Sequence, residues 1–194
     1  MMRDPRLSLV LVLACAGLLA AKTADLQEYA GEEFGAEHGL VVLRVQRYIA
    51  EGSTSLAMTR EQKVVIATIV SVDGKQKFTV NGSDEVRAIL LPAGRWYVEQ
   101  LQHARVRDLP KFASKDQAKV RSFEVVGGSI NYAGVYTARY PLDAEGRESV
   151  EVNVEYGPDA VKEAAEAFPQ AFAAHPLVYC PVGRKCKPPS EFQF

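Results

Sequence analysis

The amino-acid sequence predicts a mainly β protein, an antiparallel β-sandwich of about seven to nine strands with one accessory helix near its C-terminus. Two observations lead to this prediction. Short apolar segments recur along the chain with turn-forming residues between them, which is typical of a sandwich. One longer segment, near residues 158–174, instead repeats apolar residues at helical spacing. We expect the sandwich domain to span residues 40–180.

The first strands are predicted from apolar runs that give way to alternation. Residues 40–48 begin fully apolar and then alternate, as a strand does where it leaves a covered region. Residues 64–72 repeat this pattern, and Asp73-Gly74 supplies a hairpin turn toward residues 77–80. These two strands should therefore be neighbours in one sheet.

A second hairpin is expected around a proline and a glycine. Pro92 presets one turn dihedral and Gly94 can take a positive φ. Residues 86–91 should therefore reverse direction and pair with residues 96–101.

The later elements follow further turn signals. Residues 122–126 and 130–140 are predicted strands on either side of a Gly-Gly pair, and residues 149–156 should pair with the second of them. Residues 177–179 are expected as a last strand.

The predicted helix has a proline at each boundary. Pro158 stands at a first-turn position, and Pro169 should end or kink the helix. Its apolar face is expected to pack across one sheet or to cap an open end of the sandwich.

The N-terminus has the pattern of a secretory signal peptide. Two arginines precede an uncharged, almost wholly apolar run at residues 7–21. This run is shorter than the roughly 20 apolar residues of a membrane-spanning helix. We therefore expect residues 1–21 to be a signal peptide, residues 22–39 to be a flexible polar arm, and the mature chain to be periplasmic.

Cys15 lies inside this apolar run and leaves two fates open. Residues 12–15 resemble the lipobox of bacterial lipoproteins, which would make Cys15 the lipidated first residue of an outer-membrane lipoprotein. Cleavage near Ala20, Ala21 or Ala24 would instead release a soluble protein. Membrane contact is expected only if Cys15 is lipidated.

Two further cysteines should form a disulfide. Cys180 and Cys186 flank a turn-like segment, and an oxidising compartment favours their pairing. Such a bridge would pin residues 181–194 as a local tail, and its small loop should contribute modestly to stability. His175 is the histidine nearest to Cys180, and this spacing does not match a zinc site, so no metal or cofactor is expected.

No sequence motif predicts catalysis or nucleic-acid binding. The chain lacks nucleophile-elbow, phosphate-loop and His-Glu-x-x-His motifs, and its net charge is −1. We therefore expect a protein that is not an enzyme and does not bind nucleic acid. The alternative is an enzyme whose site is assembled by folding from His103, Glu99 and Arg105.

Four aromatic residues are candidates for a binding surface. Trp96 and Tyr97 are adjacent in a predicted strand, so their side chains point to opposite faces. One should lie in the core, and the other could join Tyr132 and Tyr136 in an exposed binding platform. Core packing of Trp96 and Tyr97 is the competing interpretation.

Two segments resemble parts of a known group of proteins. Residues 90–98 (LLPAGRWYV) and residues 123–134 (FEVVGGSINYAG) are similar to turn-and-strand segments of transthyretin-like, or carboxypeptidase-regulatory-like, sandwiches in poorly characterised bacterial envelope lipoproteins. The resemblance covers residues 40–172 and implies the fold and an envelope location, but no catalytic residues. We therefore expect a non-catalytic binding or envelope-assembly module, whose partner is an envelope protein or a small envelope ligand.

Overall fold

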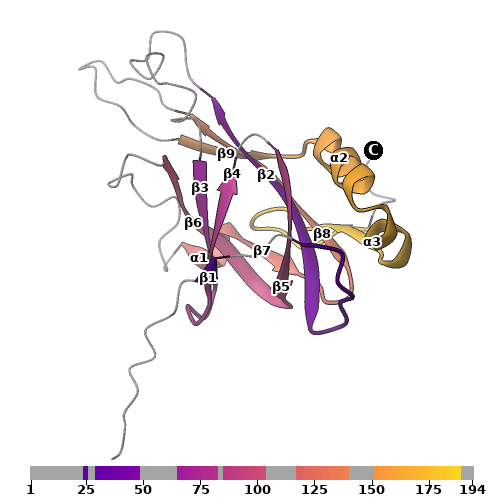
Figure 1. Ribbon diagram of the computed structural model, residues 1–194. Coiled ribbons are helices and arrows are strands. Elements are labelled where there is room, and N and C mark those ends of the chain that lie inside the picture. Colours follow the sequence, from indigo (N-terminus) through magenta and orange to yellow (C-terminus); the bar gives the residue numbers. More distant parts are fainter. Residues whose placement is uncertain are drawn as a thin grey trace, which may run out of the picture.

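Two packed β-sheets form the body of the protein, as the sequence predicts, and helices cover the outer face of one sheet (Figure 1). The computed structural model describes residues 24–25, 29–48, 65–82, 85–103, 117–139 and 151–188. Cys15 and the expected signal peptide lie outside these residues, as does Arg105.

The first sheet contains the predicted hairpin. Its five strands are, in spatial order, β1 (Ala24–Asp25), β4 (Lys77–Gly82), β3 (Val65–Ser71), β6 (Gly94–His103) and β7 (Ser122–Val125). The turn between β3 and β4 is held by Asp73, whose carboxylate accepts hydrogen bonds from the Ser71 hydroxyl at 2.6 Å and from the Lys75 backbone N–H at 3.1 Å. The neighbours predicted from this turn are confirmed.

The second sheet is mixed rather than purely antiparallel. Its strands are, in spatial order, β10 (Leu177–Tyr179), β8 (Ile130–Arg139), β2 (His38–Tyr48) and β5 (Val86–Pro92), with β9 (Glu151–Glu155) also paired to β8. The predicted β8–β9 pair and the predicted last strand are confirmed. However, β2 and β10 both run parallel to β8. Parallel neighbours need a long connection, so turn signals between successive strands do not reveal them.

The expected hairpin between residues 86–91 and 96–101 is wrong. β5 pairs with β2 in the second sheet, whereas β6 pairs with β3 and β7 in the first. Residues 92–95 therefore form a corner that carries the chain from one sheet to the other. Gly94 has the predicted positive φ, 144°. Pro92 and Gly94 identify a change of chain direction, but they do not determine which sheet the next strand joins.

Residues 123–134, the second of the two segments that carry the family resemblance, form a second corner between the sheets, from β7 to β8. Asn131 is fully buried there and its side chain bonds to the backbone of Val126 and Ser129 at 2.8–3.0 Å. A side chain at Gly127 would place its Cβ 1.8 Å from the carbonyl oxygen of Ala36, so only glycine fits. Packing of the corner therefore explains the glycine at position 127 and the asparagine at position 131.

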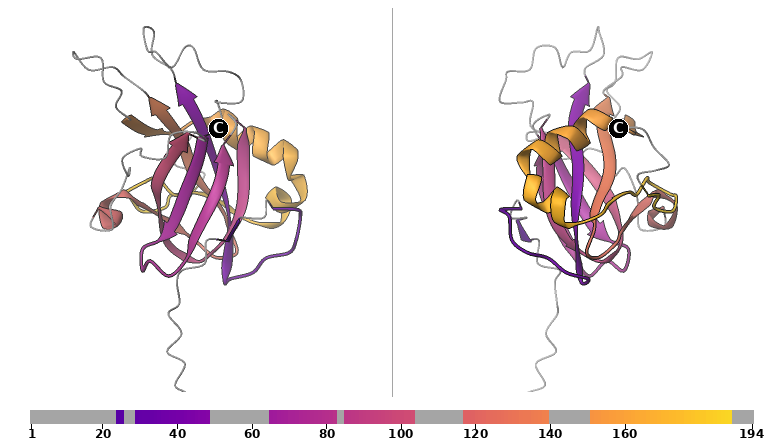
Figure 2. Two further views of the ribbon diagram at one scale, coloured as in Figure 1. Left: turned by 60° about the vertical axis from the view of Figure 1, so that its left-hand side comes forward. Right: turned by 90° about the vertical axis from the view of Figure 1, so that its right-hand side faces the viewer.

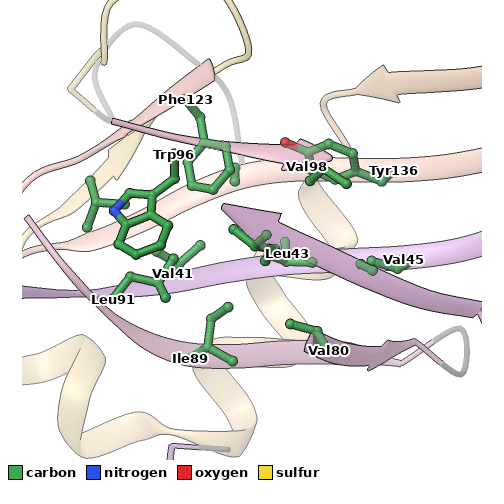
Figure 3. Packing of buried hydrophobic residues seen from close by; sticks show 14 of the residues in the cluster. Val41, Leu43, Val45, Val80, Ile89, Leu91, Trp96, Val98, Phe123 and Tyr136 are labelled. Atoms are coloured by element: carbon green, nitrogen blue, oxygen red, sulfur yellow. The ribbon is translucent and has the colours of Figure 1, made fainter. Parts of the chain in front are cut away.

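The main hydrophobic core lies between the two sheets (Figure 3). Trp96 and Phe123 of the first sheet pack there together with residues of the second sheet, including Val41, Leu43 and Tyr136. Alternate residues of β2 face the other side, toward the helices. Because β2 is covered on both faces, its sequence begins as an uninterrupted apolar run.

The predicted helical segment folds as two helices across the outer face of the second sheet (Figure 2), α2 (Pro158–Ala167) and α3 (Pro169–Ala174). Pro169 separates them, as expected. Glu163 on α2 forms an ion pair with Arg44 of β2 and accepts a hydrogen bond from the Val86 backbone N–H of β5 at 3.2 Å. These contacts fix α2 to two neighbouring strands. A short helix that the sequence did not predict, α1 (Ala118–Arg121), covers part of the first sheet.

Residues 29–37, expected to belong to a flexible arm, pack against the sandwich and its helices. Tyr29 is 7% exposed and its backbone N–H donates to the Ala88 carbonyl at 3.0 Å. Its ring contacts Phe34 and Phe168, with ring centres 6.1 and 5.4 Å away. Phe34 in turn stacks on His175, with ring centres 3.9 Å apart. This segment is therefore part of the folded domain.

Candidate functional site

The four aromatic residues selected from the sequence form no exposed platform. Trp96, Tyr97, Tyr132 and Tyr136 are at most 3% exposed. Trp96 and Tyr136 lie between the sheets, and Tyr97 packs beneath α1 on the outer face of the first sheet. Both faces of each strand are covered at these positions, so adjacent aromatic residues are buried on opposite sides.

The residues of the alternative enzyme site are only partly described. Glu99 is half-buried on β6, and its carboxylate forms an ion pair with Lys77 of β4 at 2.9 Å. His103 is the last residue of the same strand, so its Cα lies about 13 Å from that of Glu99. The Glu99 carboxylate therefore links β6 to β4 across the intervening strand β3, which is an ordinary structural role.

A pocket opens at the edge of the second sheet, where β9 and β10 lie end to end along β8. One edge of β8 pairs with β2, so β9 and β10 both pair with its other edge. The pocket has a volume of about 410 Å³, within the size range of small-molecule sites. We call it the tyrosine pocket, and it is lined by Val154, Glu155, Tyr156, Tyr179, Pro181, Val182, Arg184 and Lys187.

Three tyrosines meet at the inner side of this pocket. Tyr132 and Tyr179 are direct partners in the β8–β10 pair, so their side chains lie on one face of the sheet, with ring centres 5.6 Å apart. Tyr156 follows the end of β9, and its ring centre lies 4.9 Å from that of Tyr179 and 5.7 Å from that of Tyr132. The Tyr132 hydroxyl donates to the Gly157 carbonyl at 2.7 Å and accepts from the Gly157 N–H at 3.1 Å. Tyr132 thus fixes the start of α2 beside the pocket.

The predicted disulfide between Cys180 and Cys186 is present and closes the loop that forms one wall of the pocket. Within this loop, Val182 packs against the core between the sheets. The Gly183 N–H donates to the Ser122 carbonyl of β7 at 2.8 Å. In Figure 1 the C-terminal segment, in yellow, runs from α3 back toward β7. The bridged loop therefore contacts both sheets, whereas the sequence predicted only a pinned tail.

The hydroxyls at the pocket remain protonated at neutral pH. Burial raises the pKa of Tyr132 to about 12, an effect that the hydrogen bond from the Gly157 backbone partly opposes. Burial also raises the pKa of Tyr179 and of Tyr156. The two tyrosines that line the pocket, Tyr156 and Tyr179, therefore present protonated hydroxyls as well as ring faces.

Charged side chains at the pocket are a guanidinium, an ammonium and a carboxylate, from Arg184, Lys187 and Glu155. All three residues are exposed. Together with the tyrosines, they can hold a small ligand through ring contacts, hydrogen bonds and charge. Across the ranges that the structure describes, no cluster of three or more His, Cys, Asp or Glu could hold a metal ion.

Comparison with known proteins finds no matching family model, no similar curated protein and no similar solved structure. The resemblance to transthyretin-like envelope proteins therefore stays a prediction. None of the helices among the described residues has the length and apolar character needed to cross a membrane.

Proposed function

We propose that this chain is an exported, non-catalytic binding module of the bacterial periplasm and that the tyrosine pocket is its binding site. The pocket carries the proposal, because its walls come from two strand ends and a disulfide-closed loop that are held in place by packing. Its volume of about 410 Å³ favours a small envelope ligand over an extended protein partner.

Export is supported by two independent features. Residues 1–21 have the pattern of a signal peptide, and the Cys180–Cys186 disulfide is of a kind that persists in oxidising compartments. The intact mass of protein from periplasmic and membrane fractions tests export. Loss of the signal peptide is expected, either with a lipid on Cys15 or with release of a soluble chain. Full-length protein in the cytosol would contradict export.

Binding at the pocket is tested by capture from an envelope extract. The purified protein is incubated with the extract and re-isolated, and native mass spectrometry detects what it has retained. Tyr156→Ala removes one aromatic wall of the pocket, and Lys162→Ala changes an exposed residue of α2 that does not line the pocket. We expect wild type and Lys162→Ala to retain a small molecule that Tyr156→Ala does not. Equal retention by all three proteins would overturn the proposed site.

A further inference from the structure

The tyrosine pocket has an excess of positive charge that the whole chain does not share. Arg184 and Lys187 line it together with one carboxylate, Glu155, whereas the complete chain has a net charge of −1. The two cations belong to the disulfide-closed loop and the residues just after it, and Glu155 ends β9 on the other side. The positive charge is therefore local and comes from one wall.

Both cations are close to the ring of Tyr179. Lys187 is its antiparallel partner, and the two residues exchange backbone hydrogen bonds of 2.8 and 2.9 Å. Directly opposed residues have their Cβ atoms about 5 Å apart on the same face. Arg184 is near enough for its charge to lower the pKa of the Tyr179 hydroxyl, against the larger effect of burial. An aromatic face and two cations are thus presented side by side.

We propose that the pocket binds a small monocarboxylate whose carbon skeleton has a flat, apolar face, either an aryl carboxylate or a sugar acid. This inference rests on the proposed function, because it names the ligand class of the same site. Guanidinium and ammonium groups pair with a carboxylate, and the rings of Tyr156 and Tyr179 pack against a flat carbon skeleton. Glu155 at the same rim disfavours ligands with several negative charges, because like charges repel.

The test compares charged probes with their neutral counterparts. The probes are benzoate and benzamide for the aryl class, and glucuronate and glucose for the sugar class. Binding is measured from chemical-shift changes of the backbone amides of residues 154–156 and 179–187 in two-dimensional NMR spectra. The variant is Arg184→Gln combined with Lys187→Gln, and the control is Lys185→Gln, which is exposed on the same loop but does not line the pocket.

We expect one carboxylate, or both, to shift these amides saturably and to bind about tenfold more tightly than its neutral counterpart. The probe that saturates the amides identifies the source as aryl or sugar. The double variant should lose the same tenfold, and Lys185→Gln should bind like wild type.

Two results would overturn the inference. Equal affinity for a carboxylate and its neutral counterpart would show that the pocket binds flat ligands whatever their charge. If no probe shifts these amides, the ligand class is wrong. In either case the capture experiment with Tyr156→Ala decides separately whether the pocket is a binding site.

Discussion

Tyr132 and Tyr136 allow one substitution to be compared at two fully buried sites of the same strand. Both side chains have 0% exposure. The Tyr132 hydroxyl makes two hydrogen bonds to Gly157, whereas the Tyr136 hydroxyl has no hydrogen-bond partner among the described residues. Figure 3 places Tyr136 among the apolar side chains of the core. Replacement by phenylalanine should therefore destabilise the protein at Tyr132 but not at Tyr136.

The magnitudes follow from what each hydroxyl contributes. Tyr132→Phe removes both bonds and leaves the Gly157 N–H and carbonyl without them, so the free energy of unfolding should fall by about 1–3 kcal/mol. Tyr136→Phe removes a buried polar group without a partner, whose burial costs about 1–3 kcal/mol in other proteins. Its removal should leave the free energy of unfolding unchanged or raise it.

The assay is urea unfolding followed by the fluorescence of Trp96, which is the only tryptophan and is 2% exposed. With a urea dependence of about 1–3 kcal/mol per molar, the midpoints of the two variants should differ by roughly 1 M. If Tyr136→Phe loses as much stability as Tyr132→Phe, the assignment of the hydrogen bonds is wrong.

Three further predictions concern the corner, the disulfide and pH. Gly94→Val should lower the free energy of unfolding by about 1–3 kcal/mol, measured in urea, because valine is strained at a φ of 144°. Replacing Cys180 and Cys186 together by serine should lower the free energy of unfolding by about 2 kcal/mol. Amide exchange in residues 177–187 should become faster, because the disulfide no longer holds the loop in which Val182 packs against the core. Above about pH 10, the free energy of unfolding should fall toward pH 12, because folding raises the pKa of Tyr132 from 10.0 to about 12 and favours the neutral form. Urea midpoints measured at pH 8 to 11.5 follow this loss.

Each of these predictions has a result that contradicts it. Ala93→Ser, at the exposed neighbouring position, should match wild type, and a Gly94→Val protein that also matches it would show that the corner needs no positive φ. Unchanged exchange in residues 177–187 after loss of the disulfide would mean that packing alone holds the loop. A urea midpoint that stays constant to pH 11.5 would mean that the Tyr132 hydroxyl is not buried in the folded protein.

Local patterns in the sequence predicted the strands from β2 to β10 and the helix break at Pro169, because alternation, turn residues and proline act over a few residues. They did not predict β1, which lies in the expected flexible arm. They did not predict that β5 and β6 join different sheets. The pairing of β2 with β8 brings Leu40 beside Ile130, and only the complete fold determines such a contact. The error at the Pro92–Gly94 corner has the same origin.

The candidate site was predicted only in part. The spacing of Cys180 and Cys186 predicted the disulfide. Tyr132 was one of the aromatic candidates, and in the structure its ring contacts the tyrosines that line the pocket. Tyr156 and Tyr179 were missed, because one follows β9 and the other ends β10, and parallel pairing of β10 with β8 brings them together. Both tyrosines lie at the ends of predicted strands, but no short sequence motif indicates that the two strand ends meet.

Locating where a ligand binds tests the proposed binding site most directly. Hydrogen–deuterium exchange is measured for the mature protein with and without the small-molecule fraction of an envelope extract. If the tyrosine pocket binds the ligand, slower exchange is expected only in residues 154–156 and 179–187, the two segments that contain the pocket lining. Slower exchange only elsewhere, for example in residues 29–37 beside α3, would contradict it.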